Sequence, residues 1–126
     1  MKMKAAASPD AFVAELAGWQ AELVAMLRQA LNAGAAFDVI IKWGNLVFVH
    51  HGLCVLIHVE DERVVLGFWR GKRLTGLEPR IKPSGKYELG NIVFFEGDGI
   101  EAAQAERLAR EAARLNEELG DPTAIG

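Results

Sequence analysis

The first thirty residues carry apolar side chains at steps of three and four positions, the spacing of one face of a helix. Ser8, Pro9 and Asp10 precede this pattern, and a capping residue followed by proline is typical of a helix start. The apolar stripe comprises Phe12, Leu16, Trp19, Leu23, Leu27 and Ala30. The pattern predicts one helix that ends at Asn32-Ala33-Gly34, with Gly34 as a left-handed cap.

The middle of the chain changes to short runs rich in Val, Ile, Leu and aromatic residues, which are typical of strands. Strands are predicted within residues 37–41, 46–49, 53–59, 63–69 and 87–95. Short turns link the first four, and such links make neighbouring strands antiparallel because a parallel link needs a dozen or more residues. Apolar residues occupy both alternations in the runs 53–59 and 63–69, so both faces of the sheet are expected to be partly covered.

The helical spacing returns near the end of the chain. An apolar stripe of Leu108, Ala112, Leu115 and Leu119 predicts a second helix over residues 101–119, and Gly120-Asp121-Pro122 ends it. Packing both helices on one face of the sheet is the simplest way to bury both stripes. The predicted fold class is therefore α+β, an antiparallel β-sheet flanked by N-terminal and C-terminal α-helices, in a single domain over residues 1–126.

Composition adds limits on location and partners. The 126 residues suit one domain, and the single cysteine, Cys54, cannot form an internal disulfide. The basic N-terminus is followed by too few apolar residues for a signal peptide, and no run approaches the roughly 18 apolar residues of a membrane span. We expect a cytoplasmic protein that binds no membrane. A net charge of −3 also argues against nucleic acid as a partner.

The charge is unevenly distributed, because residues 70–86 contain six basic side chains against one acid, Glu78. Three glycines and two prolines in the same segment predict a long loop. Loops longer than about 12–15 residues in compact domains are often functional or disordered. We expect this loop to be mobile without a ligand and to attract a small anion.

The aromatic residues Trp43 and Trp69 stand at strand ends beside basic residues, an arrangement that favours a partly apolar cleft with a preference for anions. Packing in the core is the alternative interpretation of these tryptophans. The predicted ligand-binding residues are Lys42, Trp43, Asn45, Trp69, Arg70 and Lys86. The expected partner is a small anionic ligand or a protein segment.

Other chemical motifs are incomplete. Ser84-Gly85-Lys86 lacks the earlier glycine and the following Ser or Thr of a phosphate-binding loop. His50 and His51 are adjacent, so on a strand they would point to opposite faces and would not share a metal ion. Cys54, in an apolar run, is expected to be a buried, inert thiol. We therefore expect no enzymatic activity and no cofactor, while a metal site stays open.

Two tryptophan motifs carry a resemblance to a known family. The segments Ile41-Lys42-Trp43-Gly44-Asn45-x-x-Phe48 and Leu66-Gly67-Phe68-Trp69-Arg70-Gly71-x-x-Leu74, with Ser84-Gly85-Lys86, resemble the YdhG-like domain-of-unknown-function family. The resemblance extends from the first helix to Asn116. It implies a compact α+β domain in the cytoplasm, and one branch of the family is described as frataxin-like intracellular iron chaperones. Iron is therefore the alternative partner, with Glu60, Asp61 and Glu62 as surface carboxylates that could contact it.

Overall fold

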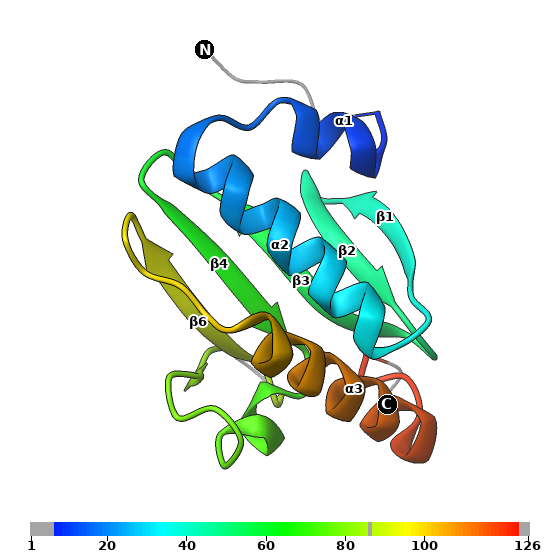
Figure 1. The fold of residues 1–126 in the computed structure, drawn as a ribbon. Helices are drawn as coiled ribbons and strands as arrows, with labels where there is room; N and C mark the ends of the chain where they lie inside the picture. The colour runs from blue at the N-terminus through cyan, green and yellow to red at the C-terminus, as the bar shows by residue number, and fades with distance from the viewer. Residues whose placement is uncertain (1–6, 86, 124–126) are drawn as a thin grey trace.

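The computed structural model describes residues 7–85 and 87–123 of the chain. Two helices come first, followed by four strands, a short 3₁₀ helix, two further strands and a last helix (Figure 1). The elements are α1 (Pro9–Ala14), α2 (Gly18–Gly34), β1 (Asp38–Lys42), β2 (Asn45–Val49), β3 (Leu53–Val59), β4 (Arg63–Phe68), η1 (Gly71–Leu74), β5 (Lys82–Pro83), β6 (Gly90–Phe95) and α3 (Ala102–Leu119).

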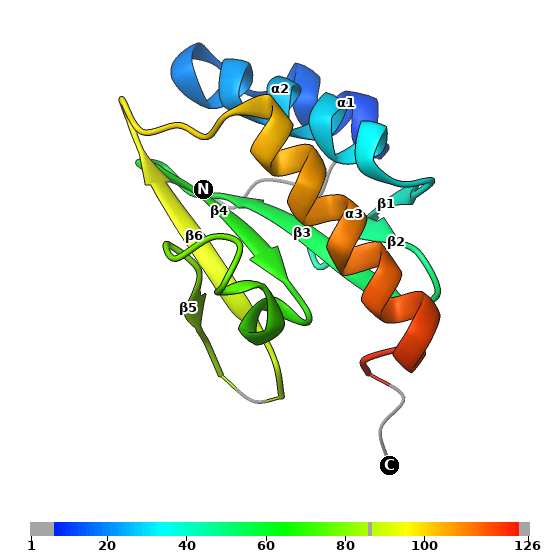
Figure 2. The ribbon, with the colours of Figure 1, turned by 60° about the horizontal axis from the view of Figure 1, so that its bottom comes forward.

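The strands form one sheet in the order β1-β2-β3-β4-β6-β5, and every neighbouring pair is antiparallel. All three helices cover the same face of this sheet, as the two views show (Figures 1 and 2). The predicted α+β class, with its antiparallel sheet and flanking helices, is confirmed. No helix among the described residues is both long and apolar enough to cross a membrane.

The predicted N-terminal helix is divided into α1 and α2, so the prediction of one helix was wrong. Ser8 does cap α1, because its hydroxyl oxygen accepts a hydrogen bond from the Ala11 N–H at 3.1 Å. Between the helices Ala17 is extended and Gly18 has φ +60°, a conformation that glycine adopts without steric cost. The break lets α1 contact β1 while α2 crosses the sheet (Figure 1).

Gly34 lies inside the end of α2 and has no positive φ, so the predicted left-handed cap is also wrong. A Cβ atom at this position would collide with the backbone oxygen of Glu106 and would lie 2.9 Å from the Cβ of Ala109. The glycine therefore allows the close approach of α2 to α3, a tertiary contact that no local pattern reveals.

The core lies between the helices and the sheet. Its largest buried side chains come from the sheet and from the facing helices and include Leu27, Phe48, Leu66, Phe94 and Leu108. The α3 stripe is confirmed for Leu108, Ala112 and Leu115, whereas Leu119 is exposed at the helix end.

The segment predicted to be one long loop contains η1 and β5. β5 pairs with β6, and the N–H of Lys72 donates to the backbone oxygen of Glu88 at 2.8 Å. The segment lies at the end of the sheet near α3 (Figure 2). Its expected mobility stays a prediction.

Candidate binding face of the sheet

The face of the sheet opposite the helices, here called the open face, is the main candidate site. Side chains alternate along a strand, so the residues that flank the buried Leu46 and Phe48 in β2 belong to the open face. No helix covers this face among residues 7–85 and 87–123. The register places on it Asp38, Ile40, Lys42, Asn45, Val47, Leu56, His58, Arg63, Val65, Gly67, Trp69, Lys82, Asn91, Val93 and Phe95.

Trp43 projects from a tight turn that joins β1 to β2. Lys42 pairs with Asn45, so Trp43 and Gly44 are the two central residues, and both have positive φ, 55° and 76°. Two-residue hairpin turns with this pattern favour Asn-Gly, and a bulky side chain is a conformational outlier there. The Trp43 side chain is nevertheless 67% exposed. Because strain is often stored at functional sites, an exposed tryptophan at such a position indicates a role outside the core.

The Trp43 and Trp69 rings lie near each other, with centroids 6.4 Å apart and planes tilted by 34°. Trp69 follows β4 at the opposite end of the sheet, so the two rings approach each other across β2 and β3. The Lys42 ammonium lies 4.6 Å from the centre of the Trp43 ring. These contacts bring three of the six predicted site residues, Lys42, Trp43 and Trp69, into one group on the open face.

Asn45 begins a row of polar side chains along the same end of the sheet. Its side-chain oxygen lies 2.7 Å from His58 Nδ1, and His58 Nε2 lies 2.9 Å from a Glu60 carboxylate oxygen. Arg63 donates two further hydrogen bonds to Glu60. Hydrogen bonds from Arg63 and then from His58 lower the pKa of Glu60 to about 2. Both oxygens of this carboxylate therefore already accept hydrogen bonds from the protein.

Further apolar side chains of the open face are exposed on other strands of the sheet. Phe95 is 52% exposed, and Ile40 and Val93 are also exposed. Val47 and Val65 are buried although they belong to the same face. Exposed apolar residues that gather on one face commonly mark an interaction surface.

Arg70 points away from this group of residues. Its side chain is buried; Nε donates to Asn116 Oδ1 at 3.0 Å and Nη2 donates to the Gly120 carbonyl at 2.8 Å. Glu88 lies 3.6 Å from Nη1. In this structure Arg70 holds the end of α3 to the sheet, so it does not join Lys42 and Trp43. Lys86, the last predicted site residue, lies outside the described residues.

The arginines of the basic segment are paired with neighbouring acids. Arg73 forms two hydrogen bonds with Glu88, and this interaction is the main cause that lowers the pKa of Glu88. Arg80 contacts the buried Glu78 in the same way and lowers the pKa of that carboxyl. Three of the six basic residues counted from the sequence, Arg70, Arg73 and Arg80, are thus paired, and they share two acids.

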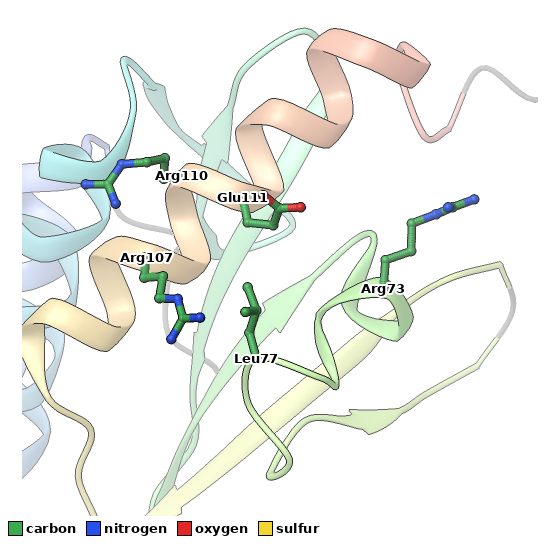
Figure 3. Close-up of a pocket in the computed structure, with 5 residues that line it drawn as sticks. All are labelled: Arg73, Leu77, Arg107, Arg110 and Glu111. Atoms are coloured by element: carbon green, nitrogen blue, oxygen red, sulfur yellow. The ribbon is translucent and has the colours of Figure 1, made fainter.

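A shallow hollow of about 330 Å³ lies between this segment and α3. Its lining residues are Arg73, Leu77, Arg107, Arg110 and Glu111 (Figure 3). Glu106 pairs with Arg110, and Arg114 pairs with Glu111. Among the described ion pairs Arg107 has no partner, so it is the lining cation best placed to meet an anion.

The thiol and the histidines are placed as follows. Cys54 is buried as expected, and burial raises the pKa of its thiol to about 12. His50 and His51 lie in a turn, where their rings are 4.7 Å apart, so the expectation that they diverge was wrong. His50 contacts Ala36 and Glu117. Within the described residues no group of three or more His, Cys, Asp or Glu is arranged to hold a metal ion.

By sequence, no family model and no curated protein matches the chain. Among solved structures it is similar to a DUF1801 family protein, YdhG of Bacillus subtilis, with a TM-score of 0.64 over 87% of this chain and 91% of that chain. The chain has a YdhG-like fold. The resemblance predicted from the tryptophan motifs is thereby confirmed for the architecture. Because sequence identity is 12%, the likeness to YdhG concerns the fold and not the function.

Sequence reasoning missed part of this open face of the YdhG-like fold. Val93 and Phe95 were assigned to an apolar strand with no sign that they are exposed. His58, which bonds to Asn45, was not among the predicted site residues. Residues 92–95 are all apolar, so the sequence contains no alternation of apolar and polar residues that would show which of them are exposed.

Proposed function

We propose that this chain is a non-enzymatic binding domain whose open face binds a protein segment. The observation that carries the proposal is the exposed Trp43, held at positive φ and adjacent to Trp69. Tryptophan is enriched among the few residues that dominate binding energy at protein interfaces. The function therefore rests on Trp43 and Trp69 as anchors for apolar side chains of the partner.

The charges around the open face define the chemistry of the partner. Lys42 and Lys82 are exposed on it, whereas Arg63 is already paired with Glu60. Asp38 is its one exposed acid among the residues placed there by register. A segment with large apolar side chains flanked by carboxylates complements this surface, because opposite charges guide association while the apolar contacts supply affinity.

A peptide-display selection against the wild-type protein tests the proposal. We expect enriched peptides to combine aromatic or large aliphatic residues with Asp or Glu. Trp43→Ala is expected to weaken binding of a selected synthetic peptide by about 30-fold, the effect of losing a hot-spot residue. Tyr87→Ala is the matched control, because Tyr87 is also exposed and also has positive φ, 63°, but pairs with neither tryptophan among the described aromatic contacts.

Stability measurements separate a binding role of Trp43 from a packing role. Trp43→Asn places the favoured Asn-Gly pair in this turn and lowers the roughly 1–2 kcal/mol that the left-handed conformation costs a bulky residue. The lost contacts with Trp69 and Lys42 offset part of this gain. We expect the variant to be at least as stable as wild type and to bind poorly. A loss of more than about 1 kcal/mol would assign Trp43 to packing.

A small anion is the second candidate ligand, and the hollow beside Arg107 is the observation that favours it. Calorimetric titration with inorganic phosphate tests this role. Binding that weakens with salt and disappears in Arg107→Gln would support it. Equal phosphate binding by the variant and wild type would place the anion elsewhere, and the peptide experiment is unaffected by either result.

A further inference from the structure

The two edges of the sheet differ in their capacity to pair with another strand. β5 has two residues, and the second is Pro83, which has no N–H. Short edge strands and prolines block pairing. β1 at the other edge has five residues and no proline, and no strand formed by the described residues lies outside it. The β1 edge can therefore accept a further strand.

The hydrogen-bonding direction of each β1 residue follows from the turn after it. A two-residue turn makes its flanking residues, Lys42 and Asn45, a hydrogen-bonded pair. Bonded pairs alternate along an antiparallel ladder, so Ile40 also directs its backbone groups toward β2. Val39 and Ile41 consequently direct their N–H and C=O groups away from the sheet.

The neighbouring strands support this assignment. The Trp69 N–H donates to the Cys54 carbonyl at 3.1 Å, and the Glu60 N–H donates to the Arg63 carbonyl at 2.9 Å. These two bonds show that the backbone groups of Cys54 and Glu60 point toward β4. Because this direction alternates along a strand, the backbone groups of His58 point toward β4 as well. The odd-numbered residues of β3 therefore pair with Leu46 and Phe48, which leaves Asn45 and Val47 to pair with β1.

The sequence of β1, Asp38-Val39-Ile40-Ile41-Lys42, complements itself in antiparallel pairing centred on Ile40. Asp38 of one copy then lies opposite Lys42 of the other copy, and both side chains belong to the open face. Val39 lies opposite Ile41, where the outward backbone groups of both residues meet. A pairing of this kind forms four backbone hydrogen bonds and two ion pairs.

We propose that two copies of this chain associate through their β1 strands and join their sheets across a two-fold axis. Opposite charges directly across a strand pair stabilise it, and like charges destabilise it. Neither Asp38 nor Lys42 has an ion-pair partner among the described residues, so the dimer supplies one to each. An unrelated peptide would gain the backbone bonds without this matched charge pattern.

Sedimentation equilibrium tests the dimer. We expect wild type to dimerise reversibly, and Asp38→Lys or Lys42→Asp alone to weaken the dimer at least about tenfold, because symmetry places two like-charge pairs in the interface. The double variant Asp38→Lys/Lys42→Asp exchanges both charges and is expected to restore wild-type affinity. Asp38 and Lys42 are exposed, so we expect each variant to keep the wild-type circular dichroism spectrum and melting transition.

A mixture of the two single variants provides the strongest result. Asp38→Lys and Lys42→Asp each repel themselves but complement each other, so the mixture is expected to form a heterodimer. Hydrogen exchange at the Val39 and Ile41 amides is expected to slow at dimer-forming concentrations. A wild-type chain that stays monomeric up to about 1 mM, or a dimer indifferent to both charge reversals, would overturn the proposal.

Discussion

Asn116 offers the sharpest test of how the structure is held together. This side chain is 1% exposed, and all its hydrogen bonds run from α3 to the end of the sheet. Its amide nitrogen donates to the carbonyls of His50 at 3.0 Å and Leu53 at 3.1 Å, and its oxygen accepts from Arg70 Nε at 3.0 Å. Asn116→Ala removes all three of these bonds.

The expected loss can be built from these bonds. Two neutral hydrogen bonds contribute about 1 kcal/mol each, and the bond from the charged Arg70 contributes about 1.5–3 kcal/mol. We therefore expect Asn116→Ala to lower the free energy of unfolding by about 3.5–5 kcal/mol. In a 126-residue domain this loss corresponds to a fall in melting temperature of about 10–20 °C.

Urea denaturation of Asn116→Ala, Arg70→Met and the double variant measures these quantities. Arg70→Met keeps an unbranched side chain but loses the bonds to Asn116 and Gly120. The double-mutant cycle is expected to show a coupling energy of about 1–2 kcal/mol. Glu118→Ala, an exposed change on the same helix, is the control and should move stability by about 0.5 kcal/mol at most.

A coupling energy near zero, or a stable Asn116→Ala variant, would refute this reasoning. An Arg70→Met variant that keeps full stability would return Arg70 to the set of residues free to bind a ligand. The experiment therefore tests both the packing of α3 and the fate of one predicted site residue.

Three other predictions concern single positions. Because burial raises the Cys54 pKa to about 12, a disulfide reagent at pH 8 is expected to label this thiol only on unfolding, and rapid labelling of the native protein would contradict this. The free energy of unfolding should also fall above pH 9, because the thiol ionises there in the unfolded chain but not in the folded one. Leu23→Ala is expected to lower the free energy of unfolding by about 2–5 kcal/mol, and Trp19→Ala by less, since Trp19 is only partly buried. Unchanged melting temperatures in both variants would show that this helix face is not part of the core. Gly71→Ala places a Cβ 2.5 Å from the Gly90 nitrogen and should lower the free energy of unfolding, measured by urea denaturation, by about 2 kcal/mol or more. Gly76→Ala is the control, because a Cβ there has no neighbour within 4 Å, and equal stabilities of the two variants would refute the contact.

The sequence by itself determined the types of the longer elements, because helices and strands bury apolar residues at different spacings. For this reason the sequence predicted the α3 stripe through Leu108 and Leu115 and the short turns between the strands of the sheet. Local chemistry also located Ser8 at a helix start and Trp43-Gly44 at a turn. These features depend on neighbours close in the chain.

Only the tertiary structure decided which groups face one another. The sequence predicts Gly34 as a left-handed helix cap, yet its lack of a side chain is required by α3. Arg70 was predicted to bind a ligand, but Asn116, 46 positions away, takes its hydrogen bonds. Trp43 and Trp69 meet only because β2 and β3 lie between their strands and let the two rings approach each other across the sheet. The open face exists because the helices of the described residues pack on the other side.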